Sequence, residues 1–250
     1  MKNYSCSNCG IINCKHQDSE YPKFCPTKEL TRDEIIEIEK LYNEDNNKEI
    51  SRISAEIEEE FYCKYTRVEE IIEFAKRLKM NKIGIVACVG LMEESRTFAK
   101  ILEKHDFEVY SAACKVGAMK KTEITGLDEE KTAVTGNVMC NPILQAKILN
   151  KEKTGLNVII GLCVGHDSLF YKYSDALCTT LVTKDKVLAT MKEAGEPLNA
   201  GKIAELSGID VSAILIISKR CTLIGCTVPV IPGKLGGSIL GHLTHTGQNR

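Results

Sequence analysis

Cysteine is the residue type with the most chemical potential in this chain, because twelve thiols occur in 250 residues. Four of them, Cys6, Cys9, Cys14 and Cys25, follow the spacing C-x2-C-x4-C-x10-C. A Cys-x-x-Cys pair lets two thiolates bind one metal while nearby backbone amides donate hydrogen bonds to sulfur. Pro26 follows the last cysteine, as it often does in iron–sulfur proteins. The spacing therefore predicts a four-thiolate site.

Two kinds of metal centre suit four thiolates, a zinc ion and a [4Fe–4S] cluster, and the spacing does not separate them. His16 lies within the segment as a substitute ligand. The alternative is a polar tail with four free thiols, which is disfavoured because exposed thiols are reactive.

A second set of cysteines recurs where apolar runs end. The sequences Cys88-Val89-Gly90, Cys114-Lys115-Val116-Gly117 and Cys163-Val164-Gly165 each follow a run typical of a buried strand. In a parallel sheet the carboxyl ends of strands share one edge, where ligands bind. We therefore expect these three cysteines to converge.

Two further cysteines are candidates for this second site. Cys140 precedes a helix that opens with Asn141 and Pro142, and Cys63 precedes the helix that feeds the first strand. We predict that the five cysteines can hold a second metal centre, with glycine and helix dipoles accommodating its bulk and charge. The alternative is that each cysteine is a small buried hydrophobic residue.

Charged and polar residues accompany this edge. His166 and Asp167 follow Cys163, and they are candidates for a ligand or a general base, or else for a helix-capping pair. Arg96 and Lys115 are candidates for anion binding, although solvated loop charges are the common case.

The elements that position these residues change type near residue 82. Capping boxes begin helices at Thr31 and Thr66, and a further helix is predicted over about 48–61. Strands are then predicted at 82–88, 108–114, 157–163 and 178–183, with helices between them and an irregular stretch over 115–138. This alternation predicts a parallel sheet with right-handed crossovers.

The carboxyl-terminal region has a different pattern. Residues 186–218 resemble a helix-turn-helix, with a turn at Ser207-Gly208-Ile209-Asp210. The would-be recognition helix is too apolar to read a major groove well, so a helical appendage is the alternative to DNA binding. We predict an α/β fold with a parallel Rossmann-like sheet in residues 31–186, a cysteine-rich extension in 1–30 and a helix-turn-helix-like segment in 187–250.

Composition restricts the class of function. A formal net charge of −1 produces no strong positive field that would attract nucleic acid or an anionic membrane. Aromatic residues make up only 6% of the chain, which argues against a surface that stacks the bases of single-stranded nucleic acid. The amino terminus has no apolar core of a secretory signal, and no run is long enough to span a membrane, so we expect a cytoplasmic protein. No nucleotide-binding or serine-nucleophile signature occurs.

The sequence resembles the DUF1847 family, a family of prokaryotic proteins of unknown function that are described as predicted metal-binding. The resemblance covers about residues 4–186, and it implies metal binding without implying an activity. The matching stretches are Cys6-Ser7-Asn8-Cys9, Phe61-Tyr62-Cys63, Thr66-Arg67-Val68-Glu69-Glu70-Ile71, Cys88-Val89-Gly90-Leu91, Glu94-Ser95-Arg96, Ala113-Cys114-Lys115-Val116-Gly117, Cys140-Asn141-Pro142-Ile143-Leu144-Gln145-Ala146-Lys147 and Leu162-Cys163-Val164-Gly165-His166-Asp167-Ser168-Leu169-Phe170. Residues 191–210 instead resemble the start of winged-helix regulators.

Three functions therefore remain open. The first is an iron–sulfur protein with one or two [4Fe–4S] clusters that works with a redox partner or a small-molecule substrate. The second is a metal- or redox-responsive transcription regulator that binds DNA. The third is a zinc-stabilised binding protein.

Overall fold

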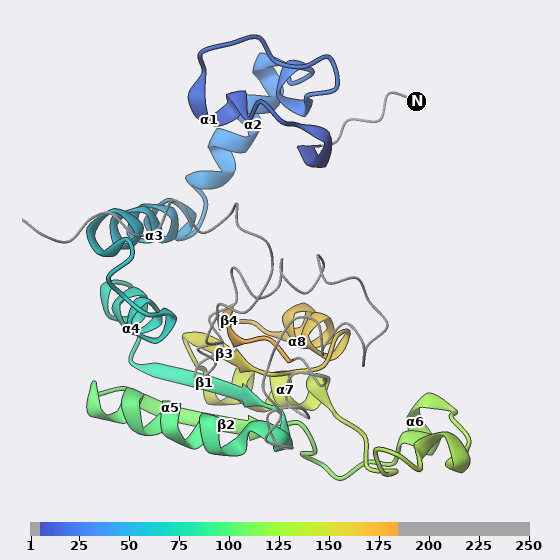
Figure 1. Cartoon of the computed structure of the whole chain (residues 1–250). Coiled ribbons are helices and arrows are strands. Elements are labelled where there is room, and N and C mark those ends of the chain that lie inside the picture. Colours follow the sequence, from blue (N-terminus) through green and yellow to red (C-terminus); the bar gives the residue numbers. More distant parts are fainter. Residues whose placement is uncertain (1–5, 185–250) are drawn as a thin grey trace, which may run out of the picture. The chain divides into compact units, whose positions relative to one another are not determined.

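A computed structural model describes residues 6–184 of the chain (Figure 1). These residues divide into two compact units, one of residues 6–81 with His105–Phe107 and one of residues 82–104 with 108–184. The first unit contains η1 (Cys6–Asn8), α1 (Asn13–His16), η2 (Pro26–Lys28), α2 (Arg32–Tyr42), α3 (Asn47–Phe61) and α4 (Arg67–Arg77). The second contains β1 (Lys82–Ala87), η3 (Val89–Leu91), α5 (Met92–Lys104), β2 (Glu108–Ala113), α6 (Lys121–Thr125), η4 (Glu129–Thr132), α7 (Pro142–Glu152), β3 (Leu156–Ile160), α8 (His166–Tyr173) and β4 (Leu177–Val182).

Both predicted capping boxes of the first unit are formed. The Thr31 hydroxyl accepts from the Glu34 backbone amide and the Glu34 carboxylate accepts from the Thr31 amide, and Thr66 and Glu69 repeat the arrangement. These caps satisfy amide donors that a helix start leaves unpaired. The two boxes therefore fix where α2 and α4 begin.

The pair α3 and α4 supplies the core of the first unit. Ile53 and Ile57 of α3 are buried, as are Ile71, Ile72 and Ala75 of α4. At the rim of this core Arg77 pairs with Glu60 at 2.6 Å and with Glu73 at 2.8 Å, which ties α4 to α3. The apolar stripes expected from helical periodicity thus face one another.

The second unit has the α/β architecture with a parallel sheet that the sequence predicts. Its four strands are all parallel and stand in the order β2-β1-β3-β4. The chain steps from β1 to β2 in one direction and from β2 across to β3 in the other, so right-handed crossovers place α5 on one face and α7 with α8 on the other (Figure 1). The strand order reverses at β1 and β3, and such a reversal is where open α/β sheets bind ligands.

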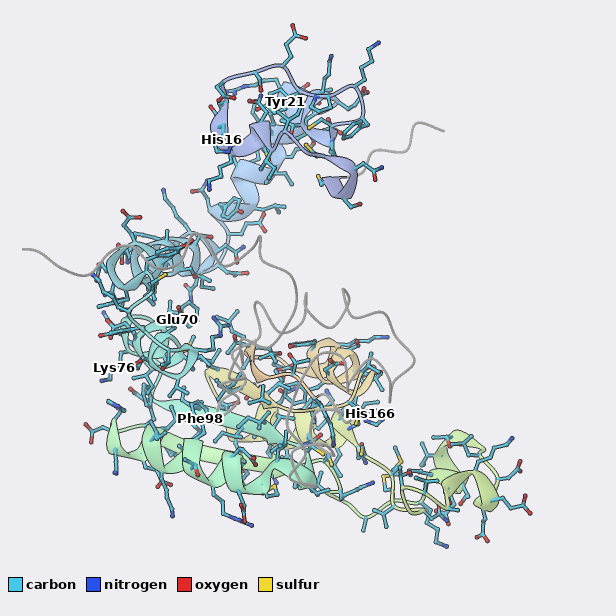
Figure 2. All side chains as sticks on the ribbon, in the orientation of Figure 1. His16, Tyr21, Glu70, Lys76, Phe98 and His166 are labelled. Carbon is cyan, nitrogen blue, oxygen red and sulfur yellow. The ribbon has the colours of Figure 1, made fainter. Side chains whose placement is uncertain are left out.

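Side chains from both faces of the sheet are buried. Phe98 and Leu102 of α5 are buried in the layer on one side (Figure 2). On the other side Val86 and Ile159 pack with Leu149 of α7 and Phe170 of α8. The continuous apolar runs of β1 and β3 are explained by this two-sided burial.

Two details differ from the sequence prediction. Strand β3 ends at Ile160, three residues before Cys163, because Gly161 has a φ of +65° and turns the chain out of the sheet. The stretch 115–138 includes the short helices α6 and η4, and a single bridge between Lys120 and Val138 closes it.

The predicted helix-turn-helix segment lies outside the described residues. Among the described helices, none has the length and apolar character needed to cross a membrane.

Candidate functional site

The strand register brings Cys88 and Cys114 together at the carboxyl edge of the sheet. Ala87 of β1 is the register partner of Ala113 of β2. The residue that follows each strand is a cysteine, Cys88 after β1 and Cys114 after β2. The Cys114 backbone amide continues the ladder by donating to the Ala87 carbonyl at 2.8 Å. Both side chains join the buried cluster on the α7 and α8 face. Alternation along the two strands therefore places both sulfurs on the same side of the sheet.

A lysine from the end of β4 completes this pair. Lys184 Nζ donates a hydrogen bond to Cys88 Sγ at 2.7 Å, and the Val89 backbone amide donates to Cys114 Sγ at 3.4 Å. Gly161, the residue after β3, lies beside both Leu91 and Lys184. A Cβ atom on Gly161 would lie 2.0 Å from Leu91 Cδ1 and 3.8 Å from Lys184 Cβ. The segments that follow β1, β3 and β4 thus meet at one place.

These contacts shift the ionisation of both thiols. The hydrogen bond from Cys114 and the Lys184 ammonium together outweigh the opposing effect of burial, and they lower the pKa of Cys88 to about 4. The pKa of Cys114 is raised, because its thiol donates to Cys88 and is itself buried. The pair therefore holds one negative charge and one proton at neutral pH, with the charge on Cys88 beside the ammonium.

Lys184 responds to the same charges. Burial by itself would lower the pKa of Lys184, but the hydrogen bond to Cys88 and the charges of Cys88, Cys163 and Cys114 give a net increase. The ammonium is therefore the counter-charge of several thiols. Lys184 was not among the predicted site residues. Its position just after the fourth predicted strand could have indicated that it lies at the carboxyl edge of the sheet.

Cys140 and Cys163 flank the buried pair. Cys140 is half-buried and packs against the cluster that contains Cys88 and Cys114. The Asn141 backbone amide donates to the Cys114 carbonyl at 2.7 Å, and its side chain accepts from Leu144 as the cap of α7. Cys163 is also half-buried and lies close enough to Lys184 to act on its pKa. The structure thus brings four of the five predicted cysteines to one edge.

Cys63, the fifth, is exposed in the first unit, where it follows α3 with a φ of +56°. Its membership of the second set stays a prediction.

Gln145 is a second residue that the sequence analysis missed. Its amide is fully buried, and Nε2 donates to the Ala112 carbonyl at 2.7 Å and lies 3.5 Å from the Ala87 carbonyl. Gln145 therefore ties β1 to β2 just before the two cysteines. Its Oε1 is buried without a hydrogen-bond partner among the residues described. A polar residue on the inner face of an apolar helix was the available signal.

The other candidate residues take ordinary structural positions. Lys115 Nζ donates to the Val138 carbonyl, and Arg96 is exposed on α5. His166 begins α8 (Figure 2), and its backbone amide donates to the Cys163 carbonyl at 2.9 Å. Asp167 accepts from the Ser168 amide at 2.8 Å. These contacts place His166 and Asp167 beside Cys163 without assigning either a role in chemistry.

The amino-terminal cysteines lie in a compact loop. The Cys9 amide donates to the Cys6 carbonyl at 3.1 Å, and the Ile12 amide donates to Cys9 Sγ at 3.4 Å. Cys6 and Cys14 are exposed, while Cys9 and Cys25 are half-buried. A backbone amide that donates to a cysteine sulfur is one of the contacts found around thiolate metal sites.

Asn13 holds this loop together. It is 2% exposed, its Oδ1 accepts from the Asp18 and Ser19 amides at 3.0 Å, and its Nδ2 donates to the Ser19 carbonyl at 2.6 Å. Within the described part of the chain, no three His, Cys, Asp or Glu side chains stand grouped as the ligands of one metal ion.

The fold and these residues define a class, an α/β protein with a parallel sheet, a thiol cluster at its carboxyl edge and a separate cysteine-rich amino-terminal segment. The chain belongs to the family described as protein of unknown function (DUF1847), whose model matches residues 25–181. It is also similar to an uncharacterized protein of Methanocaldococcus jannaschii, with 48% identity over 168 residues that cover 67% of this chain and 86% of the relative.

Proposed function

We propose that this chain is an iron–sulfur protein whose amino-terminal segment binds a [4Fe–4S] cluster through Cys6, Cys9, Cys14 and Cys25. The observation that carries the proposal is the lack of a core in this segment. Asn13 is the only buried residue among residues 6–42, and Ile11 and Ile12 are each 51% exposed. A segment that buries no apolar side chain needs another source of order. Metal ligation supplies it, because the free energy of binding becomes free energy of folding.

The residues around the four sulfurs suit a charged centre. The Ile12 amide already donates to Cys9 Sγ, and such a bond stabilises negative charge on a thiolate. Cys25 immediately precedes η2, so its sulfur stands where a short helix begins. A bound [4Fe–4S] cluster would supply one-electron transfer, which is why we propose a redox function.

The proposal is tested by metal analysis of the full chain purified without oxygen. We expect about four iron and four sulfide per chain from one cluster, with the absorption and paramagnetic resonance spectra of a [4Fe–4S] centre. Cys25→Ser should remove most of that iron. Cys178→Ser is the matched control, because Cys178 is a half-buried thiol in β4 outside the amino-terminal set. Zinc at about one equivalent with no sulfide would contradict the proposal and support a zinc-stabilised protein.

A second metal centre on the sheet-edge cysteines stays a prediction, and the same measurement tests it. About eight iron per chain, falling by half in Cys88→Ser and Cys163→Ser, would indicate two clusters.

The regulator hypothesis depends on residues 187–210, which lie outside the described part of the chain. Salt-sensitive, sequence-specific DNA retention would support it.

A further inference from the structure

The sheet edge holds two thiols placed for chemistry that needs no metal. Cys88 and Cys114 continue the Ala87 to Ala113 register on adjoining parallel strands. Adjoining strands lie about 4.8 Å apart, which falls within the Cα separation that a disulfide spans. Both side chains belong to the same buried cluster, and the backbone amide of Val89, the residue after Cys88, donates to Cys114 Sγ at 3.4 Å. The two side chains therefore lie on the same face at neighbouring register positions, where a disulfide requires little backbone movement.

Charge and access distinguish the two sulfurs. Lys184 Nζ lies 2.7 Å from Cys88 Sγ, so the ammonium favours negative charge on the Cys88 sulfur. Cys88 is 6% exposed and Cys114 is 2% exposed. A large disulfide substrate would reach such atoms poorly, whereas a peroxide is only two heavy atoms across its reactive bond. Cys88 is thus suited to attack a small oxidant, and Cys114 to resolve the product.

We propose that Cys88 and Cys114 form a peroxide-oxidisable dithiol, in which Cys88 is the attacking sulfur and Cys114 is the resolving sulfur. In the first step the Cys88 thiolate attacks one oxygen of hydrogen peroxide, the O–O bond breaks, and Cys88 sulfenic acid and hydroxide result. In the second step the Cys114 thiol attacks the Cys88 sulfur, which forms the disulfide and releases water. Two electrons pass from the two sulfurs to the peroxide, and the Cys114 proton leaves in the water.

The inference is independent of the amino-terminal cluster, because none of its residues belongs to that segment. It does compete with a metal centre on the sheet-edge cysteines, since two sulfurs joined to each other cannot both ligate iron. Cys140 and Cys163 lie beside the pair as half-buried thiols. Which sulfur Cys88 joins is therefore the decisive observation.

The test uses the full chain, reduced and then exposed to about one equivalent of hydrogen peroxide at pH 7, followed by alkylation and peptide mass mapping. We expect a disulfide between the peptides of Cys88 and Cys114. Cys88 should be consumed at least about tenfold faster than Cys178, whose pKa is raised by burial. Cys114→Ser should leave a Cys88 sulfenic acid that dimedone traps, and Cys178→Ser should behave as the wild type.

Three outcomes would overturn the proposal. The first is a Cys88 that survives peroxide as a free thiol. The second is a Cys88 that joins Cys140 or Cys163 in place of Cys114. The third is loss of sheet-edge iron with no Cys88–Cys114 disulfide, which would assign the sulfurs to a metal centre. Peptide mapping of the wild-type chain, together with its iron content before and after peroxide, decides all three without depending on the folding of any variant. Failure of this test leaves the amino-terminal iron count unaffected, so the two proposals are separable.

Discussion

Cys88 and Lys184 set the charge of the sheet edge. Neither residue is unusual in sequence. The charge is localised because Cys88 follows β1, Lys184 lies two positions beyond the end of β4, and Lys184 Nζ is 2.7 Å from Cys88 Sγ. A thiolate is ordinarily unstable in a buried position, since burial favours the neutral form. Here the Cys114 hydrogen bond and the ammonium outweigh burial.

The ionisation of Cys88 gives a prediction at the residue scale. The ultraviolet absorbance of thiolate should include a component that titrates with a midpoint near pH 4 and disappears in Cys88→Ser. The pKa is lowered from its ordinary value of about 8.5. The contribution of Cys88 to the free energy of unfolding is therefore full above about pH 8.5 and falls as the pH drops toward about 4. Lys184→Gln should raise the midpoint, because it removes the positive charge. A wild-type midpoint near 8.5 would contradict this account.

At the scale of elements, the turn after β3 decides where the cysteine loops lie. Gly161 has a φ of +65°, and its amide still donates to the Val182 carbonyl at 2.8 Å. The loop that carries Cys163 therefore leaves the sheet at Ile160 while β4 remains paired. Leu91 fills the space where a Gly161 side chain would stand.

Two glycines with similar backbone angles provide a test of this turn. Gly126 has a φ of +70° but has open space where a Cβ atom would lie, whereas a Cβ atom on Gly161 would collide with Leu91. Gly126→Ala should lower the free energy of unfolding by about 1 kcal/mol from backbone strain alone. Gly161→Ala should cost about 1–3 kcal/mol more, because overpacking adds to the same strain. Chemical denaturation measures both. Equal losses in the two variants would show that Leu91 moves aside without cost. If Gly161→Ala loses more stability than Gly126→Ala, adding Leu91→Ala to the Gly161→Ala variant should recover part of the loss, because it removes the collision.

At the scale of the whole molecule, the described residues form two units, and burial differs sharply between the sheet domain and residues 6–42. Residues 82–104 and 108–184 surround a sheet with buried side chains on both faces, whereas residues 6–42 bury only Asn13. The region that matches the family model includes parts of both units, since it begins at Cys25 and extends into β4.

This contrast predicts how metal removal affects the chain. On the proposed function, treatment with a strong chelator, or Cys25→Ser, should make residues 6–42 sensitive to a protease, because the proposed cluster supplies the ligand bonds that order the segment. The fragment that contains residues 82–184 should survive, because its core does not depend on the amino-terminal thiols. Mass spectrometry of a protease time course identifies the cleavage sites. Equal resistance with and without metal would show that Asn13 and its hydrogen bonds order the loop unaided.

The sequence by itself determined the longer helices, the strands and their order. Capping boxes fixed the starts of α2 and α4, and the change from helical to strand periodicity near residue 82 predicted the parallel sheet, because caps and periodicity are local properties. It also indicated that Cys88, Cys114 and Cys163 share one edge, since that follows from the topology of any parallel sheet.

Only the tertiary structure decided which of these residues touch. Register made Cys88 and Cys114 immediate neighbours, the positive φ of Gly161 moved Cys163 off the strand, and the end of β4 supplied Lys184. Such contacts join residues as far as 96 positions apart in the chain, and no local pattern encodes them. Gln145 was missed for the same reason, because its partners are carbonyls of two distant strands.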